Sequence, residues 1–214
     1  SNGVNEIVEV VIGYDGIVIA NSIKVAPMKL TRKDIFLALA AKVPGAVDGE
    51  LIENPYKTWK DVNPALPATA IEVMGPPPTS GTRDAFAELG LEGGCKKIDW
   101  INALKKTDKH AFKEVCHTIR EDGVYIEAGE NDNLIVQKLS ANPNMVGIFG
   151  YSYMEENASK VHGINMNGVN PTIATISDGF DSVISAEIGT SSSESSPSSL
   201  SRIPLQTLIH PSQI

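Results

Sequence analysis

The sequence predicts an α/β domain, and three segments support this fold class. A strand-like run at residues 70–74 leads through Gly75 and three prolines into an amphipathic helix that begins near Ser80. A second apolar run at residues 124–126 precedes a helical pattern that starts at Asn131, and a third lies at residues 146–149. Strands that alternate with helices in this way are typical of α/β proteins.

The N-terminal part of the chain adds two strands and a helix. Apolar residues at 6–12 and 17–20 predict two strands joined by a turn at Tyr14-Asp15-Gly16. Thr31 followed by Asp34 resembles a capping box, so a helix with a core-facing apolar stripe should follow and stop near residue 44.

The middle and the end of the chain complete the prediction. Residues 56–67 hold Trp59, Pro64 and Pro67 and follow directly on Pro55, which favours a packed loop. Trp59 is either a buried anchor or an aromatic that stacks on a ligand. Helical patterns predict helices at residues 97–104, 108–120 and 151–157, and residues 172–176 are expected to form the last strand.

Composition excludes several classes of function. With 214 residues and 42% hydrophobic content, the chain can bury a core in one or two domains. Its net charge of -8 disfavours nucleic acid and anionic membranes as partners. No apolar run reaches the roughly 18 residues that span a bilayer, and no signal-peptide pattern opens the sequence.

A candidate anion site lies at the start of the helix near Ser80. Ser80 and Thr82 carry hydroxyl donors, Gly81 lets backbone N–H groups approach a ligand, and Arg83 adds a planar cation suited to tetrahedral oxyanions. The alternative is a plain helix N-cap, which binds nothing. Asn131, at the start of a later helix, leaves the same two interpretations open.

Two cysteines and two histidines allow further interpretations. Cys95 and Cys116 form either a disulfide, expected in an oxidising compartment, or two buried thiols. His110, Cys116 and His117 could ligate a metal, but their spacing matches no strong zinc signature, so no metal and no other cofactor is expected. A hydrolase using Cys116 with His117 or His110 is disfavoured, because adjacent helical residues point about 100° apart.

The chain resembles the phosphate-binding proteins of bacterial ABC phosphate importers, a type II periplasmic-binding-protein family. The matching stretches occur in the family's order, at residues 12–20, 79–86, 127–136 and 146–153. The resemblance implies a non-enzymatic, monomeric periplasmic protein that captures inorganic phosphate and delivers it to permease subunits. It also implies that Ser80, Gly81 and Thr82 contact phosphate and that Tyr14 and Asp15 lie at the hinge.

The resemblance further implies a domain division. Residues 1–21 would be a remnant of the first lobe with a hinge strand, 22–165 the second lobe, 166–180 the hinge return, and 181–214 an irregular, low-complexity tail. The chain would thus be a truncated family member. An abrupt change to Ser-rich sequence motivates the hypothesis of a frameshift near Phe180, with ordinary divergence as the alternative.

Two departures from the family pattern bear on the ligand. The family carries an Arg and an Asp just before the Ser-Gly-Thr turn, where this chain has Pro76 and Pro78. Arg83 could replace the cation, but the acid that selects protonated phosphate is missing. Sulfate is therefore an alternative ligand, and a degenerate lobe that keeps only an interaction surface is an alternative function.

Overall fold

A central mixed sheet organises the molecule in the computed structural model, which describes residues 14–129, 131–177 and 184–187. The strand order is β10-β1-β7-β5-β6, with β8 also paired to β1. Strand β5 pairs in parallel with β6 on one side and with β7 on the other, whereas β1 runs antiparallel to β7, β8 and β10. The strands are β1 Tyr14–Ser22, β5 Val73–Gly75, β6 Tyr125–Glu127, β7 Val146–Gly150, β8 Val161–Gly163 and β10 Ile184–Glu187.

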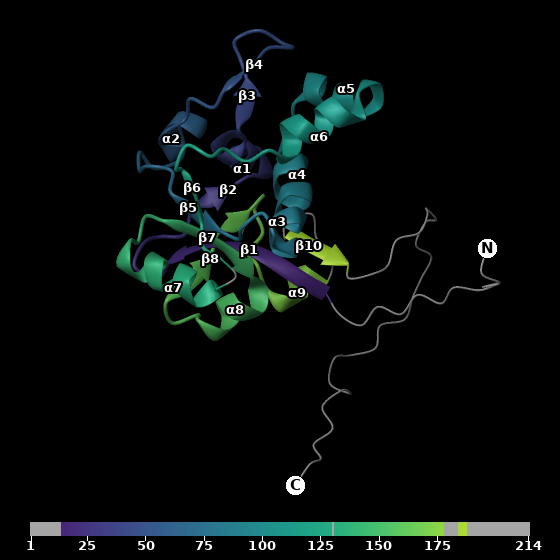
Figure 1. The fold of residues 1–214 in the computed structure, drawn as a ribbon. Helices are drawn as coiled ribbons and strands as arrows, with labels where there is room; N and C mark the ends of the chain where they lie inside the picture. Colours follow the sequence, from purple (N-terminus) through teal and green to yellow (C-terminus); the bar gives the residue numbers. More distant parts are fainter. Residues whose placement is uncertain (1–13, 130, 178–183, 188–214) are drawn as a thin grey trace, which may run out of the picture.

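Helices cover both faces of this sheet (Figure 1), which confirms the predicted α/β class. Alternation along β1 sends Ile17 and Ile19 into one hydrophobic cluster and Val18 and Ala20 into the other. The first cluster includes side chains from α1 Arg32–Leu39, α2 Trp59–Val62 and α3 Gly81–Phe86. The second is covered by α7 Asp132–Ala141 and α8 Tyr151–Glu156.

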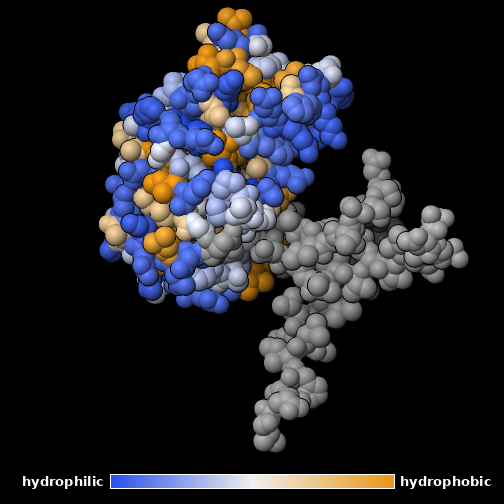
Figure 2. Space-filling model, in the orientation of Figure 1, coloured by the Kyte–Doolittle hydropathy of each residue, from blue (hydrophilic) through white to orange (hydrophobic). Residues whose placement is uncertain are grey.

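A smaller core lies beside the first face. It packs Phe36 and Val43 against Phe112 and the disulfide between Cys95 and Cys116. The contributing elements are β3 Lys42–Pro44, β4 Leu51–Glu53, α4 Glu92–Cys95, α5 Asp99–Thr107 and α6 Lys109–His117. The β3–β4 hairpin projects from this end (Figures 1 and 2) and exposes hydrophobic surface at its tip.

Two short connections complete the described fold. Strands β2 Lys29–Leu30 and β9 Asn165–Met166 form a parallel pair, and the π-helical segment η1 Ala87–Leu91 joins α3 to α4. Helix α3, η1 and α4 therefore form one helical run from the predicted anion site to the disulfide. Among the described residues, no helix has both the length and the apolar content needed to cross a membrane.

Several local predictions are confirmed. Thr31 and Asp34 form the capping box of α1, with the Thr31 hydroxyl accepting from the Asp34 N–H at 3.1 Å. Trp59 is fully buried, as expected for an anchor and not for a ligand-stacking ring. The predicted strand at residues 70–74 is shorter and lies later, at β5, while α5 begins two residues after its predicted start.

Three local predictions are wrong. Tyr14-Asp15-Gly16 is not a turn, because its backbone pairs with β10 within the continuous strand β1; residues 6–12 lie outside the described part. Residues 172–176 form most of helix α9 Ile173–Ser177, since the Thr172 hydroxyl accepts from the Thr175 N–H at 3.2 Å. The predicted loop at 56–67 contains α2, which Thr58 and Asp61 start with a second capping box.

Candidate functional site

The predicted anion site lies where the parallel strands end. Gly75 at the end of β5 is paired in register with Glu127 at the end of β6, and β7 ends nearby at Gly150. The loops that leave these strands lead directly toward α3, α7 and α8. Ligands of open α/β sheets bind outside the carboxyl ends of their strands, so the topology brings the predicted residues to this edge.

The Ser-Gly-Thr turn forms the start of α3. Ser80 is the N-cap, and its hydroxyl accepts from the Thr82 N–H at 3.3 Å. Gly81 faces open space, because a Cβ added there would meet no atom within 4 Å. Ser80 thus caps α3, which does not by itself decide between a plain N-cap and an anion site, and the open space over Gly81 leaves room for a ligand beside the positive helix end.

Arg83 is held at the same edge by three groups. Its Nη1 donates to the Pro76 carbonyl at 3.3 Å and lies 3.5 Å from Oε1 of Glu127. The guanidinium carbon stands 4.6 Å from the centre of the Tyr125 ring, within the range of a cation–π contact. The Arg83 side chain is only 14% exposed, so its charge occupies a defined place next to the turn.

Tyr125 links the strand to the proline turn. Its hydroxyl donates to the Pro76 carbonyl at 2.8 Å, the same oxygen that Arg83 contacts. Burial raises the pKa of Tyr125 to about 12, although the Arg83 charge acts in the opposite direction. The phenol therefore stays protonated and keeps donating at neutral pH.

Sequence reasoning missed Tyr125 and Glu127, because both belong to a strand far along the chain from the turn. Glu127 supplies a half-exposed carboxylate beside Arg83. The available signal was the pairing of successive parallel strands, which brings the ends of β5 and β6 together. This acid lies at a different sequence position from the one that the family pattern led us to expect at Pro76 or Pro78.

For Asn131 and the predicted hinge residues, the structure shows local contacts or strand position, which do not test a ligand contact or a hinge role. Asn131 is the N-cap of α7, and its side chain accepts from the Asn133 N–H at 3.0 Å. The side-chain amide oxygen Oδ1 of Asn133 in turn accepts from the Tyr153 hydroxyl of α8. The backbone of Tyr14 and Asp15 lies in β1. A ligand contact by Asn131 and a hinge role for Tyr14 and Asp15 stay predictions.

The cysteine region is a structural cluster. Cys95 and Cys116 form a disulfide and are fully buried, so neither is a thiolate nucleophile or metal ligand. His117 lies 2.7 Å from the Glu92 carboxylate, which also contacts Lys96 at 2.6 Å. Burial opposes ionisation of Glu92, but its hydrogen bonds to Lys96 and His117 lower the pKa overall. No cluster of metal-ligating side chains occurs among the described residues.

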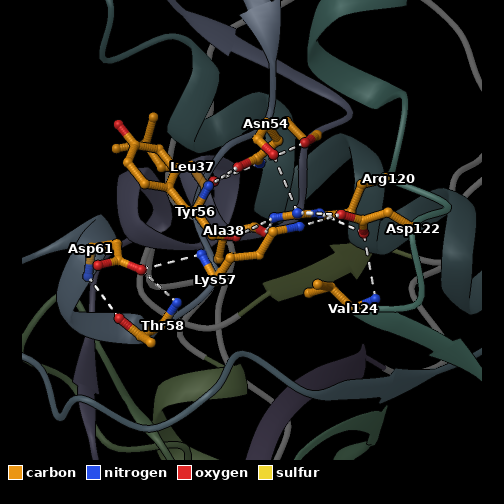
Figure 3. Close-up of polar contacts among 11 residues, drawn as sticks. Leu37, Ala38, Asn54, Tyr56, Lys57, Thr58, Asp61, Arg120, Asp122 and Val124 are labelled. Carbon is orange, nitrogen blue, oxygen red and sulfur yellow. Dashed lines mark hydrogen bonds and ion pairs between the residues drawn. The ribbon is translucent and has the colours of Figure 1, made fainter.

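A second polar cluster surrounds Arg120 (Figure 3). This buried guanidinium donates to the carbonyls of Ala38, Tyr56 and Asn54 at 3.2, 2.9 and 3.3 Å. Its Nε also donates to Asp122 at 2.8 Å, and the hydrogen bonds from Arg120 to this carboxylate hold the pKa of Asp122 well below its ordinary value. Arg120 therefore connects α1 and the segment before α2 to the chain entering β6. All three of its guanidinium nitrogens donate hydrogen bonds within this structural cluster.

A groove of about 560 Å³ lies at the opposite end of the strands. Its lining includes Asn21 at the end of β1, Thr69 before β5 and Asn144 before β7. The remaining walls are largely apolar, with Pro27, Met28 and Leu66 among them. None of the predicted ligand residues lines this groove.

Known proteins resemble this chain in both sequence and fold. A family model described as the PBP superfamily domain matches residues 1–186. The chain is 30% identical over 135 residues to the phosphate-binding protein PstS of Staphylococcus saprophyticus, covering 61% of this chain and 34% of that protein. Protein SphX of Synechococcus elongatus is 27% identical over 136 residues, at 61% and 33% coverage.

Solved structures agree with the family match. PstS from Borrelia burgdorferi superposes with a TM-score of 0.55 at 20% identity, covering 82% of this chain and 57% of that one. A possible phosphate binding protein from Planctomyces limnophilus gives a TM-score of 0.54 at 23% identity, covering 80% and 50%. The chain spans about a third of the length of the curated relatives it matches.

Proposed function

This chain belongs to the PBP superfamily, and from that premise we propose that it binds inorganic phosphate as a substrate-binding component of an ABC phosphate importer. The observation that carries the proposal is the turn from Ser80 to Thr82 at the carboxyl edge of the sheet, with Arg83 fixed beside it. The names of the matched relatives support phosphate as the ligand. Function by capture and release requires no bond chemistry and no cofactor.

The donors in this region suit an oxyanion. Backbone N–H groups at the start of α3 and the hydroxyls of Ser80 and Thr82 would replace water around the ion. Arg83 would neutralise part of its charge. Asn131 is a further proposed contact, because it begins the neighbouring helix α7.

Glu127 would allow the site to distinguish phosphate from sulfate. A carboxylate at neutral pH accepts hydrogen bonds and repels anions. Hydrogen phosphate and dihydrogen phosphate carry a P–OH group that can donate a hydrogen bond to Glu127, whereas sulfate at neutral pH has no proton with which to donate one. We therefore propose that Glu127 takes the role of the selecting acid that Pro76 and Pro78 do not supply.

We infer the location, oligomeric state and partners of the protein from its family. The protein would act outside the cytoplasmic membrane, as a monomer that passes phosphate to permease subunits. A second lobe would close over the ligand. Residues 22–165 are proposed as one lobe. Of residues 181–214, the structure describes only β10 Ile184–Glu187.

One lobe should bind weakly. About three or four charge-assisted hydrogen bonds at about 1.5–3 kcal/mol each gross roughly 5–12 kcal/mol, and association costs about 4–15 kcal/mol. We expect millimolar binding of phosphate by this chain.

Titration of the full chain tests the proposal. Phosphate and sulfate are added separately, and binding is followed through the amide signals of Gly81 and Thr82 by nuclear magnetic resonance. In wild type we expect phosphate, and not sulfate, to shift these signals saturably. In Glu127→Gln we expect a smaller difference between the affinities for phosphate and sulfate. Equal responses to both anions would indicate a general oxyanion site. No response to either would favour a lobe that retains only an interaction surface.

A further inference from the structure

We propose that Tyr125 is a positioning residue that fixes Arg83 in its anion-binding orientation, an inference that rests on the proposed function. Three described contacts support it: the ring beneath the guanidinium at 4.6 Å, the bond from the Tyr125 hydroxyl to the Pro76 carbonyl at 2.8 Å, and the bond from Arg83 to that same oxygen at 3.3 Å. Tyr125 therefore holds both Arg83 and the turn that Arg83 contacts.

The guanidinium keeps donors for a ligand in this arrangement. The hydrogen bonds from Arg83 to Pro76 and to Glu127 both use Nη1. The Arg83 side chain keeps 14% of its surface exposed, and in the described part of the chain neither Nη2 nor Nε is among the buried atoms that lack a hydrogen bond. A guanidinium with one face on a ring and one nitrogen anchored presents its remaining edge as a fork for two oxyanion oxygens.

The backbone is built around this contact. Gly75 ends β5 opposite Glu127, and a Cβ on Gly75 would lie only 2.4 Å from the Tyr125 hydroxyl oxygen. Tyr125 is only 7% exposed and takes part in the main core cluster. The ring is thus fixed by the core, and Arg83 takes its orientation from a rigid platform and not from its own flexible chain.

The positioning of Arg83 by Tyr125 should have a measurable effect on phosphate affinity. An arginine held in place loses less freedom when it binds an anion, so removing its platform should weaken binding even though the charge remains. A cation–π contact of this kind corresponds to about a threefold to thirtyfold effect on affinity. The effect must disappear when Arg83 itself is absent.

A double-mutant cycle tests the inference in the full chain, with inorganic phosphate as the probe. Tyr125→Leu should weaken phosphate binding about threefold to thirtyfold, while Tyr125→Phe, which keeps the ring, should stay within about threefold of wild type. In an Arg83→Gln background, Tyr125→Leu should cause no further loss. Tyr56→Leu, which removes a ring from the core away from the turn, is the control: it should lower stability and leave phosphate affinity unchanged.

Two results would overturn the inference. The first is unchanged affinity in folded Tyr125→Leu, and the second is an equal loss in the wild-type and Arg83→Gln backgrounds, which would indicate a general structural role. Ligand-free spectra give an independent reading, since the ring shifts the Arg83 Hδ signals and Tyr125→Leu should abolish that shift. Failure of wild type to bind phosphate would refute the proposed function, whereas an unshifted Arg83 Hδ signal in wild type would refute the platform itself.

Discussion

Opening the disulfide between Cys95 and Cys116 should destabilise the chain by about 3 kcal/mol. The bridge closes a loop with a sequence separation of 21 residues, and the loop-closure relation for that length gives about 3 kcal/mol. A domain of this size has a free energy of unfolding of about 5–15 kcal/mol, so the loss is a large share of the total. At a urea slope of about 1–3 kcal/mol/M, the midpoint should fall by about 1–3 M.

The assay is urea unfolding of Cys95→Ala, Cys116→Ala and the double variant, followed by tryptophan fluorescence because Trp59 is fully buried. Either single substitution opens the loop, so each should cost nearly as much as the double. Additive single effects would mean that packing of the sulfur atoms, and not the cross-link, provides the stability. A double variant within about 1 kcal/mol of wild type would refute the loop-closure argument itself.

Three further predictions concern local contacts. Thr31→Ala should cost about 1 kcal/mol of unfolding free energy, since it removes the capping box of α1, whereas Thr31→Ser should restore most of it in the same urea assay. Gly94→Ala should cost about 1–3 kcal/mol, because the added Cβ would lie 2.0 Å from the Arg32 carbonyl oxygen; a neutral result in thermal unfolding would contradict that close helix contact. Asp122 has a lowered pKa because of its hydrogen bonds to Arg120, so its contribution is full above its ordinary value of 3.8 and is lost as the pH falls through the lower folded value. The partly exposed carboxylate should therefore give wild type an advantage of about 0.5–1 kcal/mol over Asp122→Asn at neutral pH that shrinks in acid, and a pH-independent difference in unfolding midpoints would count against it.

The sequence predicted the features that a few neighbouring residues determine. The Thr31 capping box, the Asn131 N-cap and the helix start at Ser80 each depend on contacts within four positions, and all three are present. The disulfide was one of two open alternatives, and the structure contains it. Such local signals need no knowledge of the sheet.

The wrong or missing predictions arose where the local sequence preference disagrees with the three-dimensional surroundings of a segment. The β-branched residues at 172–176 favour a strand, but the hydroxyl pair of Thr172 and Thr175 caps a helix there. Tyr125 and Glu127 were missed because only strand register brings them to Arg83. No pattern near Ser80 records those partners, so part of the candidate site was not predictable from its own segment.

The central position of β1 has a consequence for the order of folding. The strands that pair with β1 are β7, β8 and β10, all from the last part of the described chain. During synthesis from the N-terminus, the pairing of β1 with β7 must wait until residues 146–150 emerge, and closing so long a loop is slow. The part of the core that β1 and β7 share therefore forms only after these late strands have been made.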